Sequence, residues 1–417
     1  MLNGMKSGNM GKLSERSAYA INPILEEDEL ATQLHKRGKK VIKLNRGDPP
    51  VYFPTPKYII DAYVKALRGG KTYYSDATGI DELKEAVQGR YSRMYGLHID
   101  SDGIIATAGI SEALHFLNDV MVNPGERAII FKPYYTAYIP RLKLAGGEPI
   151  FENYDEKDGW NIEIEHVRAS IKRMRANKEM DKVKYMLITN PNNPTGTVLK
   201  RSILKDIAEI ANDNDLLLVS DEIYDEIVFN GAQFTSISKV AKGQPYMILN
   251  GASKDFDATG FRLGLMLLPE NDRLSMELRE RLRNFAKVRL SVNTPAEYAF
   301  AEGMANVKEH SKAIKSMVRE IEARVNYAYD ILKKNDYIEA VKPNGAFYIL
   351  PRLRMDMLKI KDDRDFVVKL LKKEYIQLTR GSGFGAPNHF RIVLLPPKGI
   401  LGYSLNKIND FCESISK

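Results

Sequence analysis

Cysteine is almost absent from this chain of 417 residues, which contains one, Cys412. A single thiol cannot form an internal disulfide, which fits a reducing compartment. Long apolar runs are also missing, since no stretch approaches the roughly 20 residues that a transmembrane helix needs. Residues 1–16 are polar and rich in Gly and Ser, unlike the continuous apolar core of a signal peptide. We therefore expect a soluble, cytoplasmic protein.

Patterns typical of metal sites and nucleic-acid binding are lacking as well. The six histidines are too scattered along the sequence to indicate a metal site by their spacing. The net charge is +8, but the Lys and Arg residues are spread out and often stand beside Glu or Asp, as in residues 277–283. Neither zinc-finger spacing nor an aromatic RNA-binding signature accompanies them. The sequence predicts no metal, no nucleic acid and no membrane partner.

The length of the chain exceeds what one hydrophobic core usually supports, which favours two domains. We predict an N-terminal arm and part of a small domain at residues 1–45, a large domain at residues 46–310 and a small C-terminal domain at residues 311–417. A long amphipathic helix that includes Ile314 and Leu332 begins the C-terminal domain. The residues leave open whether the N-terminal segment is ordered over a site or forms a disordered tail.

Strand and helix patterns alternate through the first three quarters of the chain. Predicted strands cover residues 103–109, 128–131, 149–152, 183–189, 216–219, 246–249 and 263–268, predicted helices include 80–95, 163–175 and 200–212, and residues 133–138 are predicted to open another helix. The four consecutive apolar residues 216–219 are typical of a strand buried on both faces of a parallel sheet. This alternation predicts a doubly wound α/β sheet, whose ligands bind beyond the carboxyl ends of the strands. From residue 333 on, strands such as 346–350 and 376–379 mix with helices and predict a smaller α+β domain.

The stretch 250–264 places Lys254 after a short apolar run, eight residues ahead of Arg262. A lysine among small residues at a strand end can be desolvated and made nucleophilic. The planar, permanently charged guanidinium of Arg262 suits a phosphate. The junction at Gly109, where a strand enters a helix, leaves free backbone N–H groups that stabilise an anion. Lys254 is therefore a candidate reactive lysine and the Gly109 junction a candidate phosphate site, although most lysines near an arginine lie in water and many such junctions bind nothing.

Other polar and aromatic residues also stand near strand ends. Asp221 stands at the end of a buried strand, where it can be a functional carboxylate or only the cap of a helix. Asn193 lies in a turn-rich loop, where it can belong to a site or only stabilise the turn. Gly47, in another turn-rich loop, allows the backbone to approach a neighbour closely. The three tyrosines at positions 134, 135 and 138 can belong to the core or line a flat ligand.

Together these residues resemble those of the pyridoxal-phosphate enzymes of fold type I, specifically the class I and II aminotransferases, along nearly the whole chain. The matching motifs are Tyr73-Tyr74 with Gly79, Thr107-Ala-Gly109, Asn192-Asn-Pro-Thr-Gly196, Ser220-Asp-Glu-Ile-Tyr224, Ser253-Lys254 with Gly260-Phe-Arg262, Pro343-Asn-Gly-Ala-Phe-Tyr348 and Phe390-Arg391-Ile392. The resemblance implies a mainly parallel sheet sandwiched by helices, and pyridoxal 5'-phosphate as cofactor.

The resemblance also implies a role for each residue toward the cofactor. Lys254 is expected to form the Schiff base with the cofactor aldehyde and then to shuttle a proton. Asp221 is expected to keep the ring nitrogen protonated, while Tyr224 and Asn193 donate hydrogen bonds to the ring oxygen. The remaining cofactor contacts implied by the resemblance are Gly109, Ile110, Ser111, Ser253 and Arg262 toward the phosphate end, and Tyr135 over the ring, with Tyr134 and Tyr138 as competing candidates for that stacking.

Substrate binding and assembly follow from the same resemblance. Arg391 is expected to hold the substrate α-carboxylate in a fork, helped by the backbone of Gly47 and by Asn193. Tyr74 is expected to reach the phosphate of the neighbouring subunit, which implies a homodimer. No second arginine can be assigned from the sequence to a carboxylate on a substrate side chain.

One departure from the commonest family pattern narrows the resemblance. That pattern has a hydroxyl residue three positions before the lysine, where this chain has Gly251. The sequence Asn250-Gly-Ala-Ser-Lys254 is similar to the alanine aminotransferase branch, as are residues 381–385 and 293–295. We therefore expect ping-pong transamination between alanine and a 2-oxo acid, 2-oxoglutarate or pyruvate. An aspartate or aromatic aminotransferase is the nearest alternative, and a C–S lyase that works by β-elimination is further off.

Two other classes built on this fold are disfavoured. A transcription regulator of this kind carries a winged-helix domain ahead of the enzyme domain, and the residues before Val41 are too few to form one. A binding protein without a cofactor is expected to lose Lys254 or Asp221, and both are present.

Overall fold

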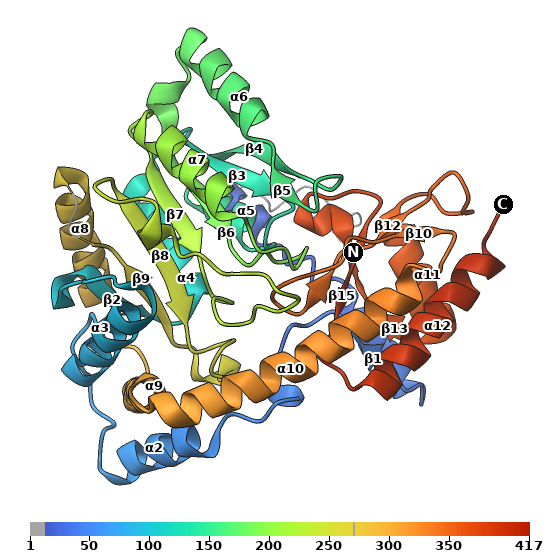
Figure 1. The fold of residues 1–417 in the computed structure, drawn as a ribbon, viewed down its shortest axis with the longest axis horizontal. Helices are drawn as coiled ribbons and strands as arrows, with labels where there is room; N and C mark the ends of the chain where they lie inside the picture. The colour runs from blue at the N-terminus through green and yellow to red at the C-terminus, as the bar shows by residue number, and fades with distance from the viewer. Residues whose placement is uncertain (1–12, 270–271) are drawn as a thin grey trace.

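The computed structural model describes residues 13–269 and 272–417. Its largest feature is an eight-stranded sheet with helices on both faces (Figure 1). From one edge to the other its strands are β2 (Ile104–Thr107), β9 (Gly264–Leu267), β8 (Tyr246–Gly251), β7 (Leu217–Asp221), β6 (Val183–Thr189), β3 (Arg127–Lys132), β4 (Glu148–Asp155) and β5 (Asn161–Ile162). β9 is antiparallel to both of its neighbours and β5 is antiparallel to β4, whereas all other pairs are parallel. The predicted mainly parallel sheet is confirmed.

Alternate residues of the strands supply two hydrophobic cores, one on each face of the sheet. Leu218 of β7 packs into one core, and its neighbours Leu217 and Val219 pack into the other. The first core is covered by α2 (Lys57–Arg68), α3 (Asp81–Tyr95), α6 (Ile164–Ala176), α7 (Arg201–Asn212) and α9 (Thr294–Ala305), and the second by α4 (Ile110–Met121), α5 (Tyr138–Leu144) and α8 (Arg273–Arg289). All residues of β7 are buried because helices cover both faces, as its apolar run predicts.

The two ends of the chain together form a smaller α+β domain with its own core. It is joined to the large sheet by α10 (Val307–Leu332), the long orange helix of Figure 1. Its other elements are α1 (Asp28–Lys36), β1 (Ile42–Lys43), β10 (Ile338–Glu339), β11 (Tyr348–Ile349), β12 (Arg352–Leu353), α11 (Asp363–Glu374), β13 (Ile376–Gln377), β14 (Thr379–Arg380), β15 (Phe390–Val393) and α12 (Lys398–Ser414). Because β1 pairs with β13, the N-terminal segment is fastened to the C-terminal part. The predicted small domain is confirmed, whereas its boundaries at residues 45 and 310 stay predictions.

Three predicted elements differ from the structure. Residues 133–138 do not open a helix, since α5 begins at Tyr138 and the Tyr134 N–H donates to the carbonyl of Phe384 at 3.0 Å. The strand predicted at 376–379 is divided into β13 and β14, which pair with different strands. The strand predicted at 346–350 is reduced to β11, because Ala346 has a positive φ of 52°, which a strand does not accommodate.

Short 3₁₀ helices connect several of these elements. They cover Glu15–Tyr19, Pro49–Val51, Ser101–Gly103, Met180–Lys182, Ile237–Lys239, Thr259–Phe261 and Gly381–Phe384. Residues 1–12 of the predicted N-terminal arm lie outside the described residues.

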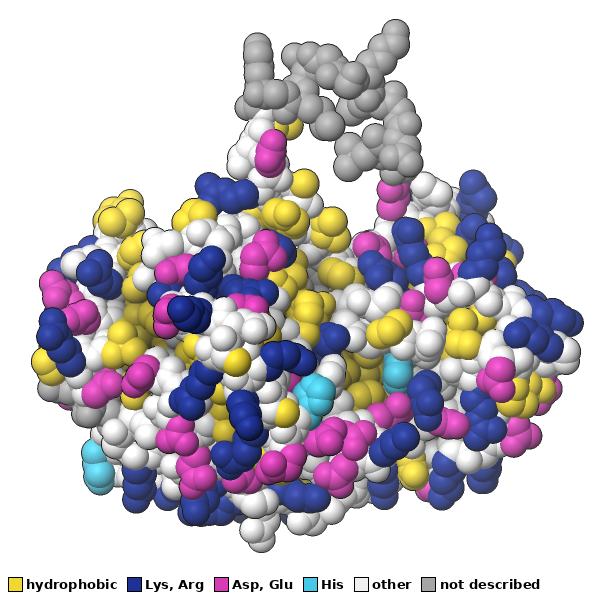
Figure 2. Space-filling view, turned by 90° about the horizontal axis from the view of Figure 1, so that it is seen from above, with side chains coloured by type: hydrophobic (Ala, Val, Ile, Leu, Met, Phe, Trp, Pro, Cys, Tyr) yellow, Lys and Arg dark blue, Asp and Glu magenta, His cyan; other side chains and the backbone are white. Residues whose placement is uncertain are grey.

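The surface carries charges of both signs. On the face drawn in Figure 2, Lys and Arg side chains lie interspersed with Asp and Glu, and hydrophobic side chains are visible in the hollow between two lobes. The net charge of +8 is therefore not collected into one basic patch on that face. Among residues 13–269 and 272–417, no helix combines the length and the apolar character that a membrane span requires.

Candidate active site

A cavity of about 680 Å³ lies beyond the carboxyl ends of the parallel strands. The residues that line it include Thr189 at the end of β6, Asp221 at the end of β7 and Lys254 after β8. The predicted site residues that line it are Gly47, Ile110, Ser111, Tyr135, Asn193, Asp221, Tyr224, Ser253, Lys254, Arg262 and Arg391. Of the other two, Gly109 immediately precedes the lining residue Ile110, and Tyr74 lies on the surface with 77% of its area exposed.

One end of the cavity is formed by the first turn of α4. Gly109, with φ of +77°, precedes this helix, so the N–H groups of Ile110 and Ser111 have no carbonyl within the helix to bind. The Arg262 guanidinium lies so close to Gly109 that a Cβ there would overlap it. Its Nη1 donates to the Thr259 carbonyl at 2.8 Å. A guanidinium beside the N-terminus of a helix provides the charge and the donors that a phosphate needs.

Gly251 has a steric role at this end of the site. It pairs with Gly264 of β9, and an added Cβ at position 251 would lie 2.6 Å from the Leu263 carbonyl oxygen and 2.9 Å from the Gly264 Cα. An added Cβ at Gly264 would lie 2.6 Å from the carbonyl carbon of Gly109. Three glycines thus bring β8, β9 and the start of α4 together, and a hydroxyl side chain has no room at position 251.

Lys254 is partly buried in the cavity, and its Nζ donates to the carbonyl oxygen of Gly47 at 2.7 Å. This contact confirms that the backbone at Gly47 approaches a neighbour closely. Burial lowers the pKa of Lys254 to about 8, with Arg391 and Arg262 acting in the same direction and Asp48 opposing them. A substantial fraction of the amine is therefore neutral, and able to act as a nucleophile or base, near pH 8.

Asp221 is also buried, at the end of β7, and a turn rather than a helix follows it. Its Oδ2 accepts a hydrogen bond from the Tyr138 hydroxyl at 2.6 Å, and its Oδ1 accepts from the Ile223 N–H at 3.3 Å. Burial raises the pKa of Asp221 to about 6 in spite of these hydrogen bonds. A carboxylate in such a place is stabilised by a cationic group facing it, such as a protonated ring nitrogen.

The three tyrosines before α5 take separate positions. Tyr138 binds Asp221, as described above, and Tyr134 stacks on Phe151 with ring centroids 5.7 Å apart. Tyr135 lines the cavity, and Tyr134 and Tyr138 do not. Of the three residues considered for stacking on a flat ligand, Tyr135 has the position that the role requires.

Arg391 also lines the cavity and is almost fully buried. Its Nη1 donates to Asn193 Oδ1 at 2.9 Å, and its Nη2 donates to the carbonyl oxygen of Asn45. The guanidinium lies 4.6 Å from the ring centroids of both Tyr348 and Phe384, which fix its plane. Arg391 Nε has no hydrogen-bond partner among the described residues. A buried, oriented guanidinium with a free donor suits a carboxylate ligand.

Asn193 and Tyr224 are linked to this arginine. Asn193 Nδ2 donates to the Tyr224 hydroxyl at 3.4 Å, and the Tyr224 hydroxyl lies 2.9 Å from that of Tyr348. Burial raises the pKa of Tyr224 well above its ordinary value, so this hydroxyl keeps its proton and can donate it in a hydrogen bond. Asn193 is therefore more than a turn former, because its side chain joins Arg391 to Tyr224.

Several cavity residues were missed from the sequence. Tyr348 stands in the motif 343–348 that supports the family resemblance, and this was the signal for it. Asp48, whose carboxylate accepts from the Thr259 hydroxyl at 2.5 Å, had only its place beside Gly47 as a signal. Phe384, which contacts Arg391 beside the cavity, belongs to residues 381–385, and the similarity of these residues to the alanine aminotransferase branch was the signal for it.

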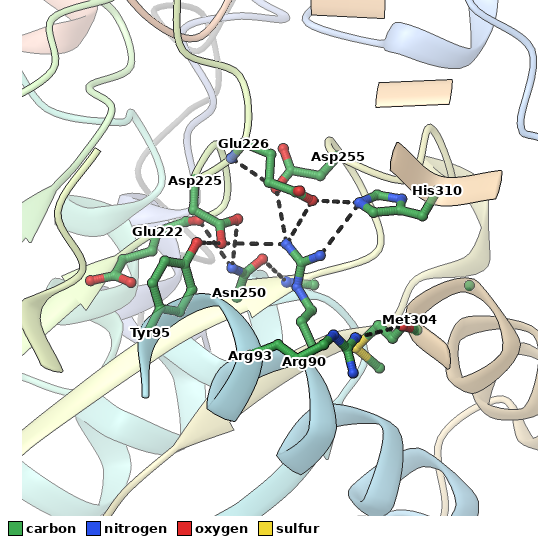
Figure 3. A network of polar contacts seen from close by, with 12 residues as sticks. Arg90, Arg93, Tyr95, Glu222, Asp225, Glu226, Asn250, Asp255, Met304 and His310 are labelled. Carbon is green, nitrogen blue, oxygen red and sulfur yellow. Dashed lines mark hydrogen bonds and ion pairs between the residues drawn. The ribbon is translucent and has the colours of Figure 1, made fainter. Parts of the chain in front are cut away.

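A buried polar network behind the cavity was also missed (Figure 3). Arg90 of α3 binds Glu226 at 2.8 Å and Asp225 at 3.4 Å, and its Nη2 lies 3.9 Å from Asp255. His310 of α10 contacts both Arg90 and Glu226. Although burial opposes it, the charge of Arg90 lowers the pKa of Glu226 to about 2. Burial and the Asp225 charge raise the pKa of Asp255 well above its ordinary value.

This network fixes two cavity-lining loops relative to each other. Asp225 directly follows Tyr224, and Asp255 directly follows Lys254. Asn250 Nδ2 also donates to Asp225 Oδ1 at 3.0 Å. The backbone segments that carry Tyr224 and Lys254 are therefore held by one buried set of charges on the side away from the cavity.

Residues 22–25 of the N-terminal segment cover part of the cavity, which bears on the question that the sequence left open about this segment. Asn22, Ile24 and Leu25 line the cavity. The segment is held by Asn45, whose Nδ2 donates to the Ile24 carbonyl at 2.9 Å, and by an Arg380–Glu26 pair with hydrogen bonds of 2.8 and 2.9 Å. The part of the segment around Ile24 is thus held over the site.

The donors and charges of the cavity fit pyridoxal phosphate. The start of α4 with Arg262 matches its phosphate, Lys254 matches its aldehyde, and Asp221 matches its ring nitrogen. The cavity also has enough volume to hold a substrate beside the ring, against Arg391.

Comparisons with known proteins agree with this arrangement. The family model "Aminotransferase class I and II" matches residues 39–401. An asparagine–oxo-acid transaminase of Streptococcus mutans is 30% identical over 97% of this chain and 100% of its own length. An aspartate aminotransferase of Geobacillus stearothermophilus is 31% identical over 97% of this chain and 99% of its own length.

Solved structures lead to the same family. An alanine aminotransferase from Pyrococcus furiosus has a TM-score of 0.89 and 33% identity, and the match covers 97% of this chain and 100% of that chain. The names of these relatives differ in the amino acid but agree in the transfer of an amino group. The chain therefore belongs to the class I and II aminotransferases, the pyridoxal-phosphate-dependent enzymes of fold type I.

Proposed function

We propose that this aminotransferase transfers the amino group of L-alanine to a 2-oxo acid, 2-oxoglutarate or pyruvate, by a ping-pong mechanism. The observation that carries this proposal is the convergence of Lys254, Asp221 and Arg391 on one cavity. The choice of alanine is supported by the sequence Asn250-Gly-Ala-Ser-Lys254 and by the 33% identity to a solved alanine aminotransferase. The apolar side chains of Ile24 and Leu25 in the cavity wall suit a small apolar substrate side chain.

In this proposal the chain binds the substrate at two points. Arg391 takes the α-carboxylate in a fork, and the neighbouring Asn193 keeps the guanidinium in its plane. The Lys254 amine, once released from its contact with Gly47, lies on the other side of the substrate α carbon. The substrate is thereby oriented with its α C–H bond toward a base.

Lys254 then moves the proton. With its pKa lowered to about 8, its neutral amine removes the proton from the substrate α carbon and would deliver it to the cofactor carbon that carries the aldehyde group. Pyridoxal phosphate, when bound, supplies the electron sink that stabilises negative charge at the α carbon. Asp221 holds a proton on the ring nitrogen, and the Tyr224 hydroxyl donates to the ring oxygen, so both residues increase the electron demand of the ring.

The role of Lys254 is tested by borohydride reduction of the purified protein followed by peptide mapping. We expect the cofactor to become permanently attached to Lys254. Attachment to any other lysine contradicts the assignment.

The substrate is tested with a panel of amino acids and three acceptors, pyruvate, oxaloacetate and 2-oxoglutarate. We expect alanine among the best donors. If aspartate or an aromatic amino acid is much better, the proposed substrate is wrong and the alternative aminotransferase is correct. Release of a thiol from a cysteine conjugate without amino transfer identifies a C–S lyase instead.

We further propose a homodimer in which Tyr74 reaches the phosphate of the neighbouring subunit. Tyr73 and Tyr74 are large aromatic residues that are 55% and 77% exposed. Residues that a dimer interface buries are exposed in this way when one chain is considered without its partner. Analytical ultracentrifugation tests the dimer, and a monomer with full activity contradicts it. The cytoplasmic location stays a prediction, for which cell fractionation is the test.

A further inference from the structure

The cavity contains one cationic side chain that the proposed chemistry does not use. Among the residues that the structure describes, four cationic side chains line it, namely Arg46, Lys254, Arg262 and Arg391. Arg262 lies at the phosphate end, Arg391 suits the α-carboxylate, and Lys254 moves the proton. Arg46 has no role in these steps.

Arg46 lies in the backbone segment 45–47, which contacts both Arg391 and Lys254. The carbonyl of the preceding residue, Asn45, accepts from Arg391, and the carbonyl of the following residue, Gly47, accepts from Lys254. The Arg46 Cα is thus about 3.8 Å from the Cα of each of these two residues. The Arg46 side chain is 51% exposed, whereas Arg391 is 1% exposed. Arg46 therefore lies nearer to solvent than Arg391 in the same cavity, where it can meet the side chain of a substrate whose α-carboxylate Arg391 holds.

The present partner of Arg46 is Asp28 of α1, in the segment that covers the cavity. An ion pair with this much exposure contributes little, because water screens it. Asp28 has other partners, since its Oδ1 accepts from Gln377 Nε2 at 2.8 Å and from Asn45 Nδ2 at 3.4 Å. Arg46 can therefore leave Asp28 without stranding the carboxylate.

We infer that Arg46 binds the distal carboxylate of a dicarboxylic substrate of glutamate length, and that Asp28 is its alternative partner when the substrate lacks that carboxylate. This inference rests on the proposed function, in which one cavity must accept both alanine and a dicarboxylic oxo acid. The methyl group of alanine offers no anion, so Arg46 stays on Asp28 and no charge is left unpaired. The distal carboxylate of a dicarboxylic substrate takes the place of Asp28 as the partner of Arg46. Arg391 binds the α-carboxylate, so each of the two negative charges has an arginine partner.

The test compares two unreactive ligands on the cofactor-loaded enzyme by isothermal titration calorimetry. Glutarate carries two carboxylates, and pentanoate has the same chain length with one. Removing one charge-assisted hydrogen-bonding partner weakens binding by about 10- to 100-fold, so we expect this loss of glutarate affinity in Arg46→Gln. Pentanoate affinity should stay within about twofold of the wild type, because that ligand never reaches Arg46. The glutarate affinity of Arg46→Lys should lie between those of the wild type and Arg46→Gln, since lysine keeps the positive charge but cannot form the two-pronged contact of a guanidinium.

Lys43→Gln is the matched control, because it removes the same charge from an exposed residue of β1 that does not line the cavity. It should leave the affinity for both ligands unchanged. Asp28→Asn should tighten glutarate binding because the competing charge is removed, and weaker binding would show that Asp28 positions Arg46 instead. Glutarate affinity unchanged in Arg46→Gln, or an equal loss for glutarate and pentanoate, overturns the inference.

These measurements are independent of the proposed alanine specificity. If the wild type fails to use alanine but Arg46→Gln still loses glutarate selectively, the proposed donor is wrong and the role of Arg46 holds. If alanine is used well and glutarate binding does not depend on Arg46, the donor holds and the role of Arg46 is wrong.

Discussion

Replacing Gly47 by alanine tests how tightly the backbone is packed against the reacting groups. A Cβ at this position would overlap the Tyr348 hydroxyl and lie 2.9 Å from the Phe347 ring. The clash is relieved in one of two ways. Either residues 45–48 move away, which breaks the 2.7 Å contact of the Gly47 carbonyl with Lys254, or the Tyr348 ring moves, which breaks its 2.9 Å contact with the Tyr224 hydroxyl.

The expected loss follows from the cost of overpacking. Inserting a methyl group into a filled site costs about 1–3 kcal/mol. At 1.36 kcal/mol for each factor of ten in rate, this corresponds to a decrease in kcat/KM of about 5- to 150-fold, if the cost falls mainly on the aligned active state. We expect most of the loss there because both ways of relieving the clash displace groups that contact Lys254 or Tyr224.

The measurement is the single-turnover reaction of the cofactor-loaded enzyme with its best amino donor. Gly399→Ala is the control, because nothing lies within 4 Å of a Cβ at that helical position in α12. We expect Gly399→Ala to match the wild type. A kcat/KM for Gly47→Ala within about twofold of the wild type would refute the reasoning, since no group at the site would then resist the added methyl.

Three further predictions concern charged groups. Asp221→Ala should retain bound cofactor, seen by its absorbance, but lose about 100-fold or more in turnover, and an unchanged rate would exclude its role at the ring nitrogen. Arg90→Met should destabilise the protein to urea by about 3–5 kcal/mol because it strands buried carboxylates, whereas the exposed Arg93, with one hydrogen bond of 3.3 Å to Met304, should tolerate Met almost unchanged. Equal losses would contradict the importance of the network. In the protein stripped of cofactor, only the neutral Lys254 amine reacts, so attachment of added pyridoxal phosphate should accelerate as the pH rises through about 8 and then level off. A rate that does not change across this range would contradict the lowered pKa of Lys254.

The secondary structure was predictable wherever one local pattern dominated. The strand 183–189 was predicted with the bounds that β6 has in the structure, because its apolar run is buried on both faces and has few competing conformations. The segment 133–138 was predicted wrongly, because its backbone donates to Phe384, a residue far away in the sequence. The strand 376–379 was divided for the same kind of reason, since β13 and β14 pair with partners from opposite ends of the chain.

By itself the sequence determined the family and predicted that Lys254, Asp221 and Arg391 belong to one site, because their motifs are continuous stretches of the chain. It also showed the missing hydroxyl at Gly251. Only the tertiary structure gave the reason, which is the contact among Gly251, Gly264 and Gly109. The same holds for the ion pair of Arg46 with Asp28, and for the network in which Arg90 lies 220 positions from His310. Side chains far apart in the sequence meet only when the sheet and the small domain have assembled, so no local pattern records their contacts.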